Sequence, residues 1–111
     1  MSLTMHYKMM VNLPDWLANR ESGDLGELTL ADTVDRAPTF RVEFEPIFVG
    51  EGYSDRRTLE FTSRGGQVTV DQLLDAAAAG YAEFIEDVGP HLWLEGLRQR
   101  EDKVWMLDIG S

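Results

Sequence analysis

The clearest pattern in the chain is an alternation of apolar and charged residues that begins at Thr39. Phe40, Val42 and Phe44 alternate with charged side chains, which is typical of a strand with one buried face and one wet face. Pro46 follows and removes a backbone donor, so we expect this strand to lie at a sheet edge or to bulge there.

A second alternating segment, residues 57–63, follows a polar, glycine-containing loop at 50–55. Leu59 and Phe61 are its apolar positions and are expected to face inward. The residues expected to face outward are Thr58, Glu60 and Thr62. Two alternating segments joined by a turn-forming loop predict an antiparallel hairpin.

Residues 70–88 carry the strongest helical pattern, because apolar side chains recur there at three- and four-residue steps. These positions are Val70, Leu73, Leu74, Ala77, Tyr81, Phe84, Ile85 and Val88. Thr69 and Gln72 have the spacing of a capping box, in which the threonine hydroxyl accepts from a backbone amide and the glutamine reaches back to the cap. Gly89 and Pro90 are expected to end the helix.

Two further strands are predicted at 92–97 and 104–109, around a polar hairpin turn at 99–102. Both strands carry apolar residues at odd and at even positions, so both of their faces are expected to be apolar. One face should pack under the helix, and the other needs a second covering layer.

The N-terminal part gives a weaker pattern. Residues 5–11 predict a strand, and Pro14 favours the start of a short helix, since proline is tolerated in a first turn. Residues 21–37 are compatible with a short strand through Leu28 and Leu30 followed by a turn, which we favour, and with one helical turn.

These elements predict one α+β domain spanning residues 1–111. Its two layers are a mostly antiparallel sheet and one long amphipathic helix (about 70–88) packed on one face, with a short N-terminal helix in addition. A chain of 111 residues leaves no room for a second core of useful size.

The acidic surplus is the strongest signal in the composition. Twenty acidic residues against ten basic residues give a formal net charge of −10 and an isoelectric point near 4.4. Such a charge disfavours direct binding to nucleic acid and to anionic membranes. It favours a basic protein partner or a cationic small ligand, although the same charge also serves solubility alone.

The cellular location is expected to be cytoplasmic. The chain has no cysteine, so it has no disulfide framework and no thiolate chemistry. It has no apolar run of about 20 residues that could cross a membrane. Its first residues lack the basic region and apolar stretch of a signal peptide.

No motif for catalysis or cofactor binding is present: the chain lacks a P-loop, GxGxxG, GxSxG and HExxH. His6 and His91 are the only histidines, and they could share a metal only if the first strand lay beside the strand that follows Pro90. We therefore predict no metal and no cofactor, and we lean against an enzyme.

Arg64, Gly65 and Gly66 precede the predicted helix, and free amides at a helix N-terminus can bind an anion. Thr69 already occupies the cap position, however, so a simple glycine turn is the preferred interpretation.

A ligand site is conceivable on the sheet face opposite the helix. Glu43 and Glu45 point the same way along their strand, and Glu60 on the neighbouring strand is expected to share that face. An ordinary solvated face is the competing interpretation. The candidate ligand-binding residues are Glu43, Glu45, Tyr53, Glu60, His91 and Trp93.

Self-association is the second candidate property, because one helix cannot cover both faces of an apolar sheet. The candidate interface residues are Trp93, Leu97, Trp105, Leu107 and Ile109. We expect a homodimer through this sheet face or through the edge strand at Ile109. The alternative is that the segment around Trp16 covers the face instead.

The sequence alone does not determine the function. The preferred hypothesis is a non-catalytic interaction module that associates with itself and recognises a basic protein. The alternative is a small enzyme or small-molecule-binding domain with a pocket between helix and sheet.

Overall fold

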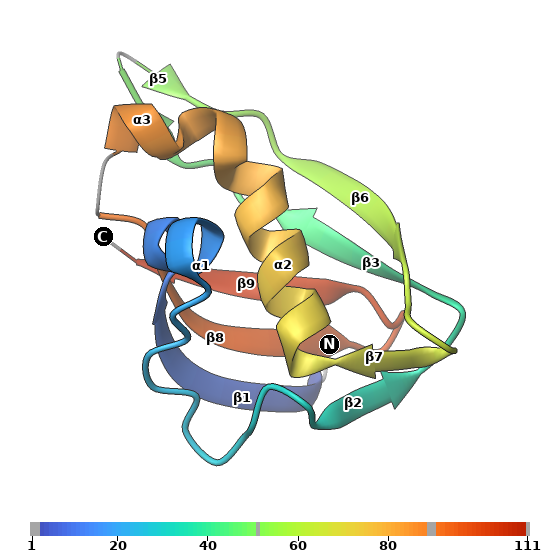
Figure 1. The fold of residues 1–111 in the computed structure, drawn as a ribbon. Coiled ribbons are helices and arrows are strands. Elements are labelled where there is room, and N and C mark those ends of the chain that lie inside the picture. The colour runs from blue at the N-terminus through green and yellow to red at the C-terminus, as the bar shows by residue number, and fades with distance from the viewer. Residues whose placement is uncertain (1–2, 51, 89–90, 111) are drawn as a thin grey trace.

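A computed structural model describes residues 3–50, 52–88 and 91–110 (Figure 1). Its strands are β1 (Leu3–Asn12), β2 (Thr33–Arg36), β3 (Thr39–Phe44), β4 (Phe48–Val49), β5 (Gly52–Tyr53), β6 (Arg57–Thr62), β7 (Gln67–Thr69), β8 (Trp93–Arg100) and β9 (Trp105–Gly110). Its helices are α1 (Leu13–Asn19), α2 (Val70–Tyr81), the 3₁₀ turn η1 (Ala82–Phe84) and α3 (Ile85–Val88). None of the helices in these ranges is long and apolar enough to span a membrane.

Five strands form the main sheet in the order β1-β8-β9-β3-β6. All neighbours run antiparallel except β3 and β9, which run parallel. Two small ladders, β2 with β7 and β4 with β5, lie beside this sheet. The predicted α+β class with a mostly antiparallel sheet is confirmed.

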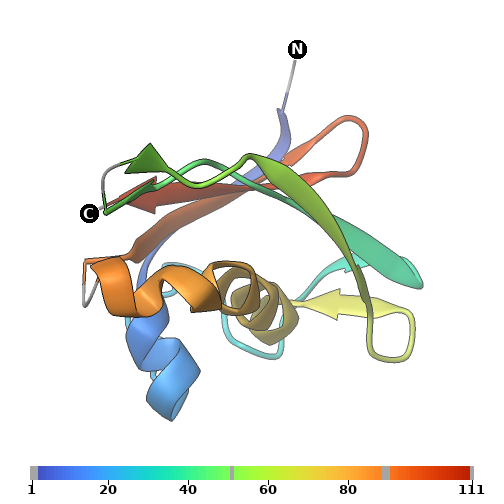
Figure 2. The same cartoon turned by 90° about the horizontal axis from the view of Figure 1, so that it is seen from above.

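The sheet arches over α1 and α2, which both lie on its inner face (Figure 2). The largest fully buried side chains are Trp16, Trp105, Tyr81 and Phe44. Trp16 packs within the helical layer, and its indole Nε1 donates to Asp75 Oδ1 of α2 at 2.9 Å. Trp16 therefore belongs to the layer on the inner face of the sheet. It does not cover the outer face.

The predicted short N-terminal helix is confirmed as α1. Asn12 Oδ1 accepts a hydrogen bond from the Asp15 amide at 3.0 Å, and Pro14 lies in the first turn. Arg20 ends the helix with a left-handed φ of 56°.

The predicted hairpin is confirmed by the β3–β6 ladder. Its six residue pairs, from Thr39–Thr62 to Phe44–Arg57, follow one another without a shift in register. Leu59 and Phe61 pack against the core, whereas Thr58, Glu60 and Thr62 are exposed. The ladder is the most regular part of the sheet.

The long helix predicted over 70–88 is interrupted. α2 ends at Tyr81, whose φ of −106° and ψ of 3° leave the helical region, and η1 and α3 follow. At Gly80, a Cβ atom would lie 1.9 Å from the Phe44 ring, so glycine lets the helix approach the sheet there. The predicted stop at Gly89 and Pro90 lies outside the described residues.

The predicted capping box is wrong in its contacts. Thr69 makes no side-chain hydrogen bond to a helix amide. The Gln72 side-chain Nε2 instead donates to the Gln67 carbonyl at 2.9 Å and to Thr69 Oγ1 at 2.8 Å. The Gln72 Oε1 accepts from the Arg64 backbone amide at 3.0 Å. Gln72 therefore ties the turn before the helix to the first helical turn.

The predicted alternation of 92–97 is broken by a shift in register between Leu94 and Gly96. A Cβ at Gly96 would lie 3.0 Å from the Tyr7 carbonyl oxygen, so glycine permits a close approach to β1. After the shift, Leu94 and Leu97 are both buried. The strand also continues to Arg100, through the predicted turn at 99–102.

The favoured strand through Leu28 and Leu30 is also wrong, since the strand in this region is β2 at Thr33–Arg36. The preceding loop instead lies along the edge of β1, where Met10 and Asp24 exchange two backbone hydrogen bonds of 2.7 and 3.1 Å. Leu28 and Leu30 pack against the core from this loop.

Candidate functional site

The sheet opens between β3 and β9. These strands pair only at Val42–Trp105 and Glu43–Met106. Beyond that point β3 ends, Pro46 turns the chain away, and β9 continues to Gly110 with β8 as its partner. No strand of the described ranges pairs with the other side of β9 after Met106. A cleft of about 470 Å³ occupies the opening.

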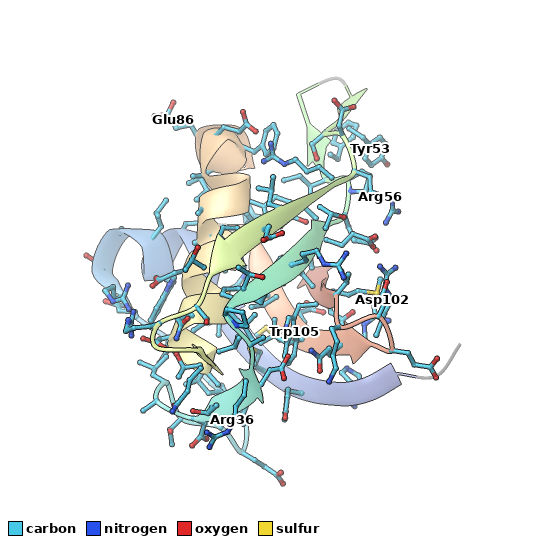
Figure 3. The ribbon with its side chains drawn as sticks, turned by 90° about the vertical axis from the view of Figure 1, so that its right-hand side faces the viewer. Arg36, Tyr53, Arg56, Glu86, Asp102 and Trp105 are labelled. Carbon is cyan, nitrogen blue, oxygen red and sulfur yellow. The ribbon has the colours of Figure 1, made fainter. Side chains whose placement is uncertain are left out.

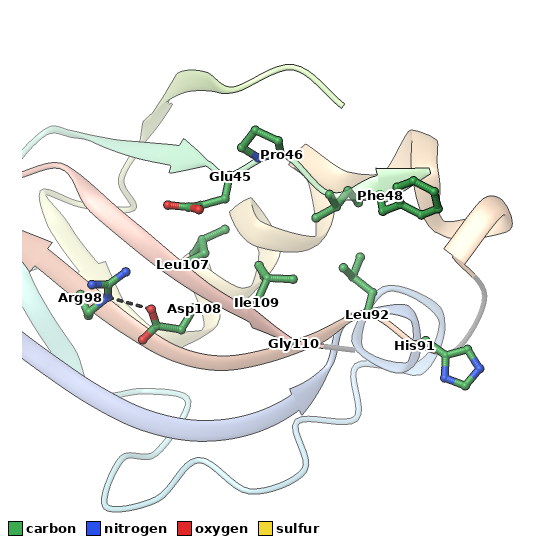
Figure 4. Close-up of a pocket in the computed structure, with 11 residues that line it drawn as sticks. Glu45, Pro46, Phe48, His91, Leu92, Arg98, Leu107, Asp108, Ile109 and Gly110 are labelled. Carbon is green, nitrogen blue, oxygen red and sulfur yellow. Dashed lines mark ion pairs between the residues drawn. The ribbon is translucent and has the colours of Figure 1, made fainter. Parts of the chain in front are cut away.

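The cleft has two walls and an apolar floor (Figure 4). One wall comes from the segment between β3 and β4, and the other comes from β8 and β9. The lining residues are Glu45, Pro46, Ile47, Phe48, His91, Leu92, Arg98, Leu107, Asp108, Ile109 and Gly110. Leu92 and Leu107 are fully buried and form part of the floor.

The first wall is fixed by buried hydrogen bonds. The Tyr81 hydroxyl donates to the Glu45 carbonyl at 2.9 Å. Burial of the phenol, with the nearby Glu45 carboxylate, raises the pKa of Tyr81 well above its usual range. The Ile47 amide donates to Ser54 Oγ, and the Ser54 amide donates to the Ile47 carbonyl, both at 2.9 Å. These contacts tie the backbone of this wall to α2 and to the segment around Ser54.

The second wall carries an ion-paired cluster. Arg98 Nε lies 2.7 Å from Asp108 Oδ1, and His6 Nε2 lies 3.4 Å from Asp108 Oδ2. The Asp108 side chain is 30% exposed and the Arg98 side chain 27%, so this pair is partly shielded from water. The negative charge of Asp108 is therefore largely matched within the wall.

Glu45 is less strongly matched. Its carboxylate is 40% exposed and lies 3.4 Å from an Arg56 guanidinium that also contacts Glu43 at 3.3 Å. An exposed, shared ion pair of this kind contributes little energy. Glu45 is therefore the carboxylate of the cleft that is most available to a ligand.

Two exposed aromatic rings stand beside the opening. Phe48 is 60% exposed and Tyr53 is 72% exposed. They pair across the β4–β5 hairpin, with ring centroids 5.3 Å apart and an edge-to-face angle of 69°. Phe48 lines the cleft and Tyr53 packs against Phe48. A pair of exposed aromatic rings beside a cleft is a candidate binding surface.

The structure brings some of the predicted ligand residues together. Glu45 and His91 line the cleft, and Tyr53 contacts Phe48 at its rim. Glu43 lies next to this group on β3, where Arg56 and Arg100 hold its carboxylate.

Two predicted ligand residues lie elsewhere. Glu60 is exposed on β6 opposite Arg41, and Trp93 begins β8 opposite Asn12, outside the cleft lining. The outer face around Glu43 is dominated by charges that pair with one another: Arg100 contacts Glu43 at 3.6 Å and Asp102 at 3.1 Å. This geometry is that of a solvated sheet face.

Phe48, Arg98 and Asp108 line the cleft but were not predicted. Pro46 is the signal that could have indicated them, because it shows where β3 leaves its neighbour. The sequence does not reveal that β9 is this neighbour, since the two strands are far apart in the chain.

Three of the predicted interface residues are corrected. Leu97, Trp105 and Leu107 are 0%, 0% and 1% exposed, so they pack inside one chain. Ile109 is half-buried in the cleft. β9 lies between β8 and β3 in the sheet order, but at Ile109 its strand partner among the described residues is β8, on one side.

The structure separates the two histidines. His6 pairs with Arg98, whereas His91 precedes Trp93, which pairs with Asn12 at the other end of the same ladder. Within the described ranges, no group of three histidine or acidic side chains could hold a metal ion.

The polar groups of Arg64, in the glycine turn before α2, already have partners within the chain. The Arg64 amide donates to Gln72, and the Arg64 side chain lies 3.5 Å from Asp71. Gly65 and Gly66 have positive φ values of 64° and 76°, as a tight turn requires. These contacts agree with the simple turn.

No protein-family model, curated protein or solved structure matches this chain. Its function must therefore be inferred from its own residues.

Proposed function

We propose that this protein is a non-catalytic binding module whose cleft accepts a cationic group carried on an apolar stem. The observation that carries the proposal is the position of the exposed Glu45 carboxylate and the exposed Phe48 ring on one wall of a cleft whose floor is apolar. An alkylammonium or guanidinium group can pair with the Glu45 carboxylate, and its methylene stem can pack on the apolar floor.

The volume and lining of the cleft support this class of ligand. Small-molecule sites generally measure about 300–1,000 Å³ and combine an apolar lining with a few polar groups. The cleft falls in this range at about 470 Å³. An aromatic ring at the rim adds a cation–π contact of about 0.5–1 kcal/mol at an exposed site.

The net charge acts in the same direction. A chain with a formal charge of −10 attracts cations over a long range, which raises the rate of encounter with a basic ligand. Because salt screens this attraction over about 8 Å at physiological ionic strength, binding should weaken as salt is raised.

The ionisable groups of the cleft favour binding over catalysis. Asp108 is held between Arg98 and His6 on one wall, and Glu45 lies on the other. Acid–base catalysis generally needs a positioned acid and a positioned base. Arg98 lies 2.7 Å from Asp108, which leaves Glu45 as the available carboxylate, and a single available carboxylate suits the pairing of a cation. The preferred role is therefore recognition.

The same chemistry can come from two sources: a lysine or arginine on an extended segment of a basic protein, or a free polyamine. Calorimetric titration with a short lysine- and arginine-rich peptide and with spermidine distinguishes them. Tighter binding of the peptide indicates a protein partner, and tighter binding of spermidine indicates a small ligand.

Three variants test the site itself. Removing the charge in Glu45→Gln should weaken binding by up to about fivefold, and removing the ring in Phe48→Ala should weaken it roughly two- to fivefold. Glu101→Gln is the matched control, because Glu101 is exposed in the β8–β9 turn, outside the cleft lining. If Glu45→Gln and Glu101→Gln bind equally well, or if neither cation binds the native protein, the proposal is wrong.

A further inference from the structure

The strand β6 forms one outer edge of the five-stranded sheet, and among the described residues its strand partner is β3 alone. In Figure 3, β6 runs across the front of the molecule beside β3. An edge strand presents unpaired backbone groups to any other strand that can reach it.

The hydrogen bond just after the end of β6 shows which of its residues point their backbone groups toward β3 and which point them away. The Ser63 amide donates to the Pro38 carbonyl at 3.0 Å, so positions 63 and 38 form a hydrogen-bonded pair. Such pairs alternate with non-bonded pairs along an antiparallel ladder. Thr58, Glu60 and Thr62 therefore direct their backbone N–H and C=O groups away from β3.

This edge lacks the protection found on the opposite edge. The loop that follows α1 covers β1, and Gly23 and Gly26 lie so close that a Cβ on either would be 2.8 or 2.6 Å from a β1 carbonyl oxygen. β6 contains no proline, and its ladder with β3 has no bulge. The strand carries two charged side chains: Glu60 on the outer face, and Arg57 on the inner face, where its guanidinium lies 3.1 Å from Glu83.

We propose that β6 pairs with β6 of a second copy, in an antiparallel register with a twofold axis at Leu59. This register places Leu59 opposite Leu59 of the copy on the inner face. It also places Arg57 opposite Phe61 of the copy, with the Arg57 guanidinium held within its own chain by Glu83 and the Phe44 ring. On the outer face, Thr58 lies opposite Glu60 of the copy.

Charge selects this register over its neighbour. A twofold axis at Glu60 would place two glutamates directly opposite each other, and like charges in that position destabilise a sheet. With the axis at Leu59, the hydroxyl of Thr58 can donate to the glutamate of the other copy. The same pair repeats across the axis, as an isologous interface requires.

A single thiol at the axis tests the register. The chain has no cysteine, so Leu59→Cys introduces the only one. Opposite residues in a non-bonded pair lie about 4.5 Å apart at Cα, which is within disulfide range. Under mild oxidation most of this variant should become a covalent dimer, whereas Thr39→Cys, exposed on the inner strand β3, should stay monomeric.

A pair of charge variants tests the same contact without a cross-link. Thr58→Lys places a positive charge opposite Glu60 of the copy and should tighten the dimer roughly 2- to 30-fold. Thr58→Glu places two carboxylates opposite each other and should weaken it similarly. Thr39→Lys and Thr39→Glu change the net charge equally but lie off the edge, so they should leave the association nearly unchanged.

Sedimentation at tens of micromolar and several salt concentrations measures all four variants. The native protein should approach twice its 12.6 kDa mass as salt rises, because salt screens repulsion between two chains of charge −10. A 12.6 kDa mass at every salt concentration, with no faster cross-linking of Leu59→Cys than of Thr39→Cys, overturns the proposal. Equal effects of the Thr58 and Thr39 variants overturn the register.

Discussion

The two sides of strand β3 differ in how far they pair. On one side β3 joins β6 through six consecutive residue pairs, and on the other it joins β9 through only two. The long ladder is a local hairpin, whereas the short one brings together strands about 60 positions apart in sequence. The cleft lies where the short ladder stops.

The difference shows how a regular sheet can produce a binding site. Pro46 ends the ladder because proline has no amide to donate, and Tyr81 then fixes the departing backbone through its bond to the Glu45 carbonyl. The sheet keeps its rigidity on the β6 side and opens on the β9 side.

The largest expected effect comes from breaking the short side. Trp105 is fully buried and forms one of the two β3–β9 pairs, so Trp105→Ala should cost roughly 3–5 kcal/mol of unfolding free energy. Phe61 on the long side is only partly buried, and Phe61→Ala should cost about 1–2 kcal/mol. Urea unfolding of both variants measures the comparison, and equal losses would contradict it.

A smaller loss of stability is expected where the chain leaves β3, at the hydrogen bond between Tyr81 and the Glu45 carbonyl. Tyr81→Phe removes the hydrogen bond to the Glu45 carbonyl, which should cost about 0.5–1.5 kcal/mol. The freed wall should also bind spermidine more weakly than the native protein does. Unchanged stability and unchanged affinity would show that this bond does not hold the wall.

The same residue gives a pH dependence with a definite sign. Burial raises the pKa of Tyr81 above its ordinary value of 10.0, so the folded state binds this proton more tightly than the unfolded state does. The stabilising contribution is complete below pH 10.0 and is lost as the pH rises toward the folded pKa. Above pH 10.0, native stability should therefore fall more steeply than that of Tyr81→Phe.

The smallest effect on stability is expected at the rim. Phe48 is 60% exposed, so Phe48→Ala should change the unfolding free energy by no more than about 0.5 kcal/mol. The same variant should nevertheless lose affinity for a cationic ligand. Thermal unfolding and titration of one preparation separate the two properties, and a parallel loss of both would assign Phe48 to the fold instead.

Local patterns predicted much of the fold. The alternation at Phe40, Val42 and Phe44 identified a strand, and Pro14 marked the short helix. The errors came from tertiary contacts that no local pattern encodes. α2 breaks where it meets Phe44, and the shift before Gly96 reflects a close approach to β1.

The candidate site was predicted only in part. Glu45, His91 and Tyr53 lie at or beside the cleft, but Asp108 and Arg98 belong to strands whose position beside β3 depends on the sheet order. From the sequence, Leu94 and Leu97 are assigned to opposite faces of the last hairpin, which makes both faces look apolar. The shift in register between Leu94 and Gly96 instead buries both leucines, and no local pattern reveals that shift.

The most direct test of the account is a map of backbone amide shifts by NMR as spermidine is added. A specific cleft predicts saturable shifts at Phe48, Asp108 and Ile109, with little change in the acidic loop that contains Glu21 and Glu27. Shifts that spread over that loop and never saturate, with the cleft amides unmoved, would show that the protein attracts cations by net charge alone.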